Sequence, residues 1–251
     1  MIDLHCHILP GIDDGASDLT ESLALLQLAV ADGITQMVAT PHINPGYFDN
    51  TKLTIHQALT LLRQALTQQN IAIQIAAAAE IRVTADLMPA FEQGQLPILG
   101  HWQGQQVLLL EFPHSHIPAG SDKLMKWLQQ RGVLPMIAHP ERNRDVQNDP
   151  KVLAPLIRAG CLFQLTASSL LGDLGERHQE CARLLLQQKL FTVMATDSHN
   201  LLRRPPKLAA AKVEVSRLTD EQYALDLVQL HPQLITAALD FNGALSQEHA
   251  L

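Results

Sequence analysis

The chain begins with Met1-Ile-Asp-Leu-His5-Cys-His7, in which an apolar start leads directly into a His-x-His pair. Alternate residues of a β-strand point to the same side. If a strand ends here, His5 and His7 can therefore present two imidazoles to one metal ion. The pair alone is a weak indication of a metal site. It gains weight because the same arrangement, an apolar run that ends in a His, Asp or Glu, recurs along the chain.

Five later segments repeat this arrangement, over residues 36–42, 73–80, 107–111, 133–139 and 191–199. Each is short, mostly apolar and without polar–apolar alternation, which is typical of a strand that is buried on both faces. A buried carboxylate or imidazole costs several kcal/mol unless it is paired or bound to a cation. We therefore expect the polar side chains that end these strands to gather around cations: His42, Glu80, Glu111, His139, Asp197 and His199.

Helical patterns alternate with these strands. Asp18 is the expected N-cap of a helix that ends near Gly33, with Glu21 as its capping-box partner. Ser121 is the expected N-cap of a helix that runs to Gln130. Further helices are expected over residues 52–69, 85–92, 150–159, 176–188, 206–217, 220–230 and 232–239, and a seventh strand over residues 161–166. The chain has no repeat and no linker-like change of composition, so we expect a single domain over residues 1–251.

The alternation of strand and helix predicts an α/β fold with parallel strand pairing and right-handed crossovers. Seven such strands can form an open doubly wound sheet or a closed barrel. In an open sheet the functional residues would concentrate at one crevice, whereas here a ligand-type residue ends nearly every strand. This favours an irregular, TIM-barrel-like (β/α)7 barrel with its chemistry at the carboxyl ends of the strands.

Composition narrows the class of protein. Lys and Arg total 18 and Asp and Glu total 25, so the net charge is −7. This balance argues against nucleic acid as the main partner, because binding to phosphate backbones favours a basic surface. The three cysteines have unrelated spacings, which indicates a reducing cytosol rather than a disulfide framework. With no secretory signal pattern and no apolar stretch of membrane-spanning length, we expect a soluble, cytoplasmic protein without direct membrane insertion.

The strand-end residues belong to longer motifs: Asp3-Leu-His5-Cys-His7, Asp13-Asp14-Gly15, Ala39-Thr-Pro-His42, Glu80, Glu111-Phe-Pro, Ala138-His139-Pro-Glu141-Arg142 and Thr196-Asp197-Ser-His199-Asn. Together they resemble the PHP (polymerase and histidinol phosphatase) superfamily. The closer resemblance is to the CpsB/CapC-type bacterial tyrosine-protein phosphatases of capsule and exopolysaccharide operons. His-Ile-Leu-Pro-Gly-Ile-Asp-Asp-Gly over residues 7–15 and Arg204-Pro-Pro point to that branch. The resemblance implies a PHP barrel and a single PHP-type phosphatase domain.

The resemblance also implies a cluster of three divalent metal ions. Transferred position by position, the first ion would be held by His5, His7, Glu80 and Asp197. Glu80 would bridge to a second ion, which Glu111 and His139 also hold. Asp14, His42 and His199 would hold the third. Mixed imidazole and carboxylate ligands suit Mn, Fe or Zn, and the family resemblance implies manganese.

The activity that the resemblance implies is metal-dependent hydrolysis of phosphotyrosine. Close metal ions lower the pKa of a bound water, which gives a hydroxide nucleophile at neutral pH. Arg142 and Arg204 occupy the family's phosphate-contacting positions, and Arg203 stays open as the acting group. A Cys-based mechanism is excluded, because no cysteine has an Arg six positions further on.

The implied partner is a phosphotyrosine protein, in particular the flexible C-terminal tail of a bacterial tyrosine autokinase of polysaccharide export. Two alternatives remain. One is a PHP-family small-molecule phosphomonoesterase or phosphodiesterase such as a histidinol phosphatase, which would need a deeper pocket. The other is a non-catalytic metal-binding module. The oligomeric state stays open.

Three features near these motifs have structural interpretations. Asp13 is expected to shape the turn beside Asp14. His114-Ser-His116 lies between prolines, so loop histidines are the expected interpretation, with a place at the rim of the site as the alternative. Tyr47 and Phe48 follow His42 closely and could flank an aromatic substrate or pack within their loop.

Overall fold

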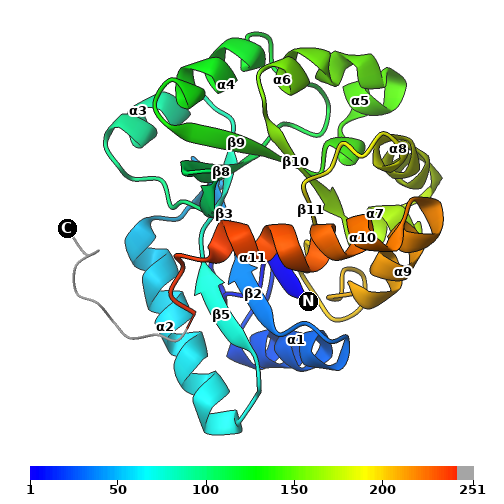
Figure 1. Ribbon diagram of the computed structural model, residues 1–251. Helices are drawn as coiled ribbons and strands as arrows, with labels where there is room; N and C mark the ends of the chain where they lie inside the picture. The colour runs from blue at the N-terminus through cyan, green and yellow to red at the C-terminus, as the bar shows by residue number, and fades with distance from the viewer. Residues whose placement is uncertain (242–251) are drawn as a thin grey trace.

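Strands and helices alternate along the computed structural model of the protein, which describes residues 1–241 (Figure 1). The last residues of the expected single domain, 242–251, lie outside the described residues. The strands are β1 (Ile2–Cys6), β2 (Gln36–Ala39), β3 (His42–Asn44), β4 (Phe48–Asp49), β5 (Gln74–Ala77), β6 (Glu80–Arg82), β7 (Gly100–Trp102), β8 (Gln105–Glu111), β9 (Val133–Ala138), β10 (Leu162–Thr166) and β11 (Val193–Ala195).

Most of the helices follow the expected ranges. They are α1 (Leu19–Ala31), α2 (Lys52–Gln69), α3 (Leu87–Glu92), α4 (Ser121–Gln129), α5 (Arg144–Asn148), α6 (Ala154–Arg158), α7 (Ala167–Leu171), α8 (Glu176–Gln187), α9 (Ala209–Leu218), α10 (Glu221–Leu225) and α11 (His231–Thr236). Short 3-10 turns cover Pro140–Arg142 and Pro150–Leu153, and a π-helical stretch covers Asp226–Leu230. Within residues 1–241, no helix combines the length and apolar character that a membrane crossing requires.

The strands pair as two sheets, which confirms the α/β class. The smaller sheet has the order β1-β2-β5, and the larger has the order β11-β10-β9-β8-β6-β3-β4. Pairing is parallel except where β4 joins β3 and β7 joins β8. The pairing gives two sheets and not one closed ring, so the closed barrel expected from the sequence is not confirmed.

Two of the expected strands are each broken into two. The segment 36–42 divides at Thr40 and Pro41, and the segment 73–80 divides at Ala78 and Ala79. Pro41 has no N–H to donate to a ladder, which explains the first break. The second break follows the first, because the N–H of Glu80 points to the carbonyl oxygens of Thr40 and Pro41. As a result, His42 and Glu80 begin new strands and pair side by side.

The edges formed by β1 and β11 also meet. The N–H of Asp197 donates to the carbonyl of His5 at 2.7 Å, and the N–H of His7 donates to the carbonyl of Ser198 at 2.8 Å. An isolated parallel bridge joins Cys6 and Ser198. These bonds bring the first and last ligand-type motifs of the sequence into contact.

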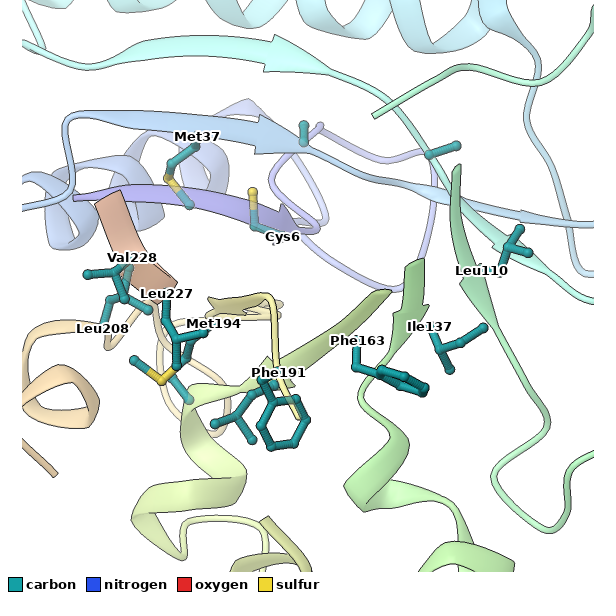
Figure 2. Close-up of a cluster of buried hydrophobic side chains, with 14 of the residues drawn as sticks. Cys6, Met37, Leu110, Ile137, Phe163, Phe191, Met194, Leu208, Leu227 and Val228 are labelled. Atoms are coloured by element: carbon teal, nitrogen blue, oxygen red, sulfur yellow. The ribbon is translucent and has the colours of Figure 1, made fainter. Parts of the chain in front are cut away.

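Strands β1, β9 and β11, and β8 from Val107 on, are buried on both faces, which explains why their sequences do not alternate. In β8, Leu108 and Leu110 belong to one apolar cluster, whereas Val107 and Leu109 belong to a second. Figure 2 shows part of the first cluster, where residues from successive strands meet C-terminal residues: Cys6, Met37, Leu110, Ile137, Phe163, Phe191, Met194, Leu208, Leu227 and Val228. Each fully buried aliphatic side chain contributes about 1.5–3 kcal/mol. This core holds the strand ends in place.

The starts of helices α1 and α4 differ from what the sequence predicted. Asp18 caps α1 as predicted, accepting from the N–H of Glu21 at 2.9 Å, but the Glu21 carboxylate accepts from Ser17 instead of closing a capping box. The expectation that Ser121 is an N-cap was wrong. The α4 helix starts at Ser121 itself, whose hydroxyl donates to the carbonyl of Pro118 at 2.6 Å.

Candidate active site

The predicted ligand side chains come together at one end of the strands. His5 and His7 are fully buried there. The other predicted residues line a cavity of about 140 Å³ directly beside them. Its walls are formed by Asp14, His42, Asn44, Phe48, Glu80, Arg82, Glu111, His114, His139, Arg142, Asp197, His199 and Arg204.

One group of side chains surrounds the two N-terminal histidines. The Nε2 atoms of His5 and His7 lie 3.2 Å and 3.4 Å from Oε2 of Glu80. Both Nε2 atoms also lie 3.4 Å from Oδ1 of Asp197. Two imidazoles and two carboxylates therefore face one point, which is the arrangement expected for the first ion.

Hydrogen bonds fix which ring nitrogen of these two histidines faces that point. Nδ1 of His5 lies 2.9 Å from Oε1 of Gln164, and Nδ1 of His7 lies 2.7 Å from Oδ2 of Asp13. An amide or carboxylate oxygen accepts, so in the neutral rings Nδ1 carries the proton and Nε2 presents a lone pair. The two Nε2 atoms are 3.3 Å apart. In the neutral rings both lone pairs would face a cation placed between them. Burial opposes a charge on His7, but the carboxylates of Asp13, Asp197 and Glu80 outweigh it and raise its pKa well above the ordinary value, so the metal-free ring holds a proton that a cation would displace.

A second group shares Glu80 with the first, and a third group lies nearer the surface. The Oε1 atom of Glu80 lies 2.8 Å from Nε2 of His139, and that nitrogen lies 3.9 Å from Oε1 of Glu111. Nearer the surface, Oδ1 of Asp14 lies 3.4 Å from Nε2 of both His42 and His199. The two oxygens of Glu80 thus face different histidines, as a bridging carboxylate would.

The backbone turns two of these side chains into the site. His139 and Asp197 have φ angles of 32° and 51°, in the left-handed region that non-glycine residues rarely adopt. Such conformations cost about 1–3 kcal/mol each and persist where the surrounding structure enforces them. His139 directly follows the buried strand β9, and Asp197 follows the buried strand β11 after one residue, Thr196. Their unusual backbone is consistent with a functional position.

Burial and neighbouring charges shift the pKa values of these groups in opposite directions. Burial and the Glu80 carboxylate raise the pKa of Glu111 to about 8. Burial and the Arg142 guanidinium lower the pKa of His139 to about 3. Burial opposes ionisation of Asp197, but Arg204 and His5 outweigh it and hold its pKa well below the ordinary value. Spread pKa values of this kind are typical of functional sites.

The arginines are arranged around Asp197. Arg142 and Arg204 both donate to its Oδ2 atom and both line the cavity. Arg203 does not line the cavity. The side chain of Asn200 accepts from the backbone N–H groups of Arg203 and Arg204, which shapes the loop that brings Arg204 inward.

The sequence predictions missed Asn44 and Arg82 among the residues that line the cavity, and they gave His114 a place there only as an alternative. Arg82 lies with Nε 3.3 Å from Oε2 of Glu111 and donates from Nη1 to the carbonyl of Phe112 at 2.9 Å. Its position two residues after Glu80 in one strand was the available signal, because alternate residues share a face. For His114 the alternative interpretation holds: it lines the cavity, its Nε2 atom lies 3.6 Å from Oε1 of Glu111, and its ring stacks on His139 with centroids 5.6 Å apart.

Two supporting residues also differ from expectation. Asp13 shapes the turn as predicted, accepting from the N–H of Gly15 at 3.0 Å, but it additionally orients His7. Gln164 was not predicted at all. A polar residue within the otherwise apolar strand β10 was its only signal in the sequence.

The residues present fit divalent cations. Several sets of three or more His, Asp and Glu side chains have ligand atoms within 4.8 Å of one another, and the sets overlap. Nδ1 of His42 and Oε2 of Glu111 are buried without a hydrogen bond to residues 1–241, although they lie 3.2 Å from Oε2 of Glu80 and 3.3 Å from Nε of Arg82, respectively. Nitrogen and oxygen donors without a thiolate suit Mn, Fe or Zn.

This fold occurs in other proteins. An organophosphorus hydrolase mutant from Deinococcus radiodurans superposes with a TM-score of 0.56 at 14% identity, over 93% of this chain and 92% of that one. At this identity the likeness shows the fold alone. The chain is therefore an α/β protein related in fold to the TIM-barrel-like phosphotriesterases, with a polar site at its strand ends.

Closer comparisons define the family. Residues 1–236 match the family model described as capsular polysaccharide synthesis, CpsB/CapC, so the chain belongs to that family. The tyrosine-protein phosphatase YwqE of Bacillus subtilis is 35% identical over 81% of this chain and 79% of its own. A crystal structure from work on YwqE and on CpsB of Streptococcus pneumoniae, described as metal-dependent tyrosine phosphatases, superposes with a TM-score of 0.87. It is 31% identical and 94% of each chain is covered. The resemblance predicted from the motifs is confirmed.

Proposed function

We propose that this protein is a metal-dependent protein-tyrosine phosphatase. The observation that carries the proposal is the pair of Nε2 atoms of His5 and His7, which face each other beside two buried carboxylates. Family membership supports the capsular polysaccharide context, and the names of the relatives support the tyrosine phosphatase activity.

We further propose three divalent ions, with manganese as the native metal. His5, His7, Glu80 and Asp197 would hold the first, Glu80, Glu111 and His139 the second, and Asp14, His42 and His199 the third. Such ions, when bound, supply an acidified water at neutral pH and neutralise phosphoryl charge. The oxygen- and nitrogen-only ligand set supports this choice of metal but also suits Fe and Zn.

The side chains of the cavity account for phosphate binding. Arg142 and Arg204 offer planar guanidinium forks whose charge is permanent and whose geometry matches phosphoryl oxygens. Asp197 holds both guanidinium groups at the cavity wall. The leaving group of phosphotyrosine is a phenolate with a pKa of roughly 10, so a strong general acid is not required.

The shape of the site supports a protein substrate over a small molecule. The cavity, at about 140 Å³, is smaller than pockets that enclose whole ligands, which span roughly 300–1,000 Å³. Asp14 and His114, at its mouth, are 49% and 47% exposed. A phosphoryl group on a flexible chain can reach such a site, and the proposed partner is the tyrosine-rich tail of a bacterial tyrosine kinase of polysaccharide export. A histidinol phosphatase would enclose more of its substrate.

We also propose that the strands form the irregular (β/α)7 barrel of PHP proteins within one domain over residues 1–251. Two observations support this. The broken strands β2/β3 and β5/β6 each continue after two residues, and the Cys6–Ser198 bridge joins the outer edges of the two sheets. The cytoplasm is the proposed compartment, which the three free cysteines support.

Peptide dephosphorylation tests the function. The metal-loaded full chain is assayed on a phosphotyrosine peptide, on the phosphoserine peptide of the same sequence and on histidinol phosphate. The proposal predicts the highest kcat/KM for phosphotyrosine and loss of turnover after chelation, with recovery on adding manganese. Preference for histidinol phosphate would support the small-molecule alternative. Absence of turnover of all three by protein shown to carry metal would reject the enzyme.

A further inference from the structure

One apolar side chain stands out in the wall of the cavity. Among the described residues that line it, Phe48 alone has a side chain made only of carbon and hydrogen, and all the others are polar or charged. Its ring is half-buried and stacks on His42 with centroids 5.5 Å apart and planes 15° apart. The phosphatase mechanism proposed above gives this ring no task.

The position of Phe48 is fixed by the local structure. In the antiparallel β3–β4 pair, Phe48 lies opposite Asn44, which also lines the cavity. The Asp49 carboxylate accepts from the N–H of Gly46 at 2.8 Å and closes the turn. The neighbouring Tyr47 is 82% exposed and does not line the cavity.

Hydrogen bonds from Asn50 also connect this hairpin to the loop that carries Asp14. The amide of Asn50 donates to the carbonyl of His42 at 2.9 Å and to the carbonyl of Ile12 at 2.8 Å. Ile12 lies in the loop that carries Asp14. Phe48 is therefore held beside the site by the turn that closes the hairpin and by the two hydrogen bonds of Asn50.

The size and polarity of the cavity determine what part of a substrate meets Phe48. The cavity of about 140 Å³ is polar and takes the phosphoryl group. The group that carries the phosphate must then lie at the mouth. A phenyl ring at the mouth would bury apolar surface against Phe48. A short alkyl group has much less apolar surface to bury there.

We propose that Phe48 is a specificity-determining residue that packs against the aromatic ring of the leaving group and selects aryl over alkyl phosphomonoesters. This inference rests on the proposed phosphatase function. Aromatic pairs contribute enough beyond simple burial to change a rate ratio by about tenfold.

The test compares two leaving groups in the metal-loaded full chain. The ratio of kcat/KM for phenyl phosphate to that for glycerol phosphate is measured in the parent and in Phe48→Ala. Comparing the ratio between variants cancels the intrinsic difference in leaving-group acidity. We expect the ratio to fall about tenfold in Phe48→Ala, mainly through KM for phenyl phosphate. Phe48→Trp should retain most of the selectivity.

Tyr47→Ala is the matched control, because it removes the adjacent aromatic ring that faces solvent. Its ratio should equal that of the parent. Inhibition by benzylphosphonate and by methylphosphonate gives a second readout that needs no turnover of the alkyl ester. Phe48→Ala should weaken the benzyl compound about tenfold relative to the methyl compound.

The outcomes separate the possible roles. If Phe48 only supports His42, the variant will lose affinity for manganese and lose turnover on both esters equally, and an unchanged ratio would overturn the proposal. If the metal-loaded parent hydrolyses neither ester, the phosphatase function fails, and this inference fails with it.

Discussion

At the residue scale, the site depends on how each histidine is oriented. The acceptors Gln164 and Asp13 hold the Nδ1 protons of His5 and His7, which leaves both Nε2 atoms facing the buried carboxylates. Without such partners an imidazole can rotate or change tautomer, and loss of an outer-shell partner of this kind typically costs about 10–100-fold in metal affinity or activity. Asp13 is therefore part of the site although it would not touch an ion.

Replacing a ligand residue should remove activity and spare the fold. We expect His199→Ala to lower kcat/KM on a phosphotyrosine peptide by about 100-fold or more, because the outermost ion loses one of its ligands. His199 follows β11 and is not part of a helix or strand, so the melting temperature of the metal-free protein should change little. His116→Ala, in an exposed loop, is the control and should match the parent. Parent-like turnover in His199→Ala would refute the assigned role.

Replacement of the two adjacent arginines should lower kcat/KM by very different factors. Arg204 lines the cavity and contacts Asp197, whereas Arg203 does not line it. Arg204→Ala should reduce kcat/KM by about 10²–10³-fold, the loss typical for removal of a group that stabilises transition-state charge. Arg203→Ala should stay within about twofold of the parent. Steady-state kinetics on both variants decide the matter, and equal losses would contradict the assignment.

At the element scale, the strands and their polar ends were predictable because buried strands leave an unmistakable apolar run, and because a charged residue at the end of such a run needs a partner. The α2 helix matched its predicted bounds, since its apolar residues recur at helical spacing and Thr51 caps its start. The breaks at Pro41 and Ala79 were not predicted. Pro41 was a signal for the first break, because it has no N–H to donate to a ladder. The second break depends on how the neighbouring strands pair, which a single segment does not encode.

The failure to place Arg82 and His114 at the site from the sequence has a similar explanation. Arg82 and His114 enter the cavity because β6 pairs with β8 and because the loop after Glu111 folds back over His139. The positive φ angles of His139 and Asp197 are likewise imposed by tertiary contacts and not by residue type. The sequence identified the ligand-type residues. The residues around them could be placed only from the packing of strands and loops.

The central strand β8 should be sensitive to truncation on its inner face. Leu109 is fully buried in the second apolar cluster. Leu109→Ala should lower the free energy of unfolding by about 2–5 kcal/mol, because the cavity left behind can relax only in part. Leu202→Ala, at a side chain 91% exposed, should change it by less than about 0.5 kcal/mol. Urea unfolding of the metal-free proteins measures both values, and a change below about 1 kcal/mol for Leu109→Ala would show that this strand is not part of the core.

At the scale of the whole molecule, the first and last motifs of the described chain meet at one buried cluster of charge. Glu80 of β6 is surrounded by His5 of β1, His42 of β3 and His139 after β9, which lie far apart in the sequence. Without cations, several of these groups must carry protons or remain close to like charges. Metal binding should therefore stabilise the fold as well as activate the site.

Metal binding should release protons near neutral pH. Burial and Glu80 raise the pKa of Glu111 to about 8, so this carboxyl is mostly protonated at pH 7 in the metal-free protein. The pKa of His139 is lowered to about 3, so His139 is already neutral and releases none. A cation must displace the Glu111 proton, and this carboxyl alone should make apparent manganese affinity rise by up to about tenfold per pH unit between pH 6 and 8. Burial opposes a charge on His7, but the carboxylates of Asp13, Asp197 and Glu80 outweigh it and raise its pKa well above the ordinary value, so His7 should release a further proton.

Titration calorimetry in buffers of different ionisation enthalpy counts the released protons. Glu111→Gln should bind more weakly and show a smaller pH dependence over the same range. A parent protein that releases no protons between pH 6 and 8 would contradict the picture of competing protons and cations.

The most direct test of the shared metal cluster is an anomalous difference map, collected at the manganese edge from crystals grown with Mn²⁺. We expect peaks between the side chains of His5 and His7, beside Glu111 and His139, and beside Asp14 and His199, with Glu80 touching more than one of them. A map with no peak among these side chains, from protein that hydrolyses phosphotyrosine, would contradict the proposed centre.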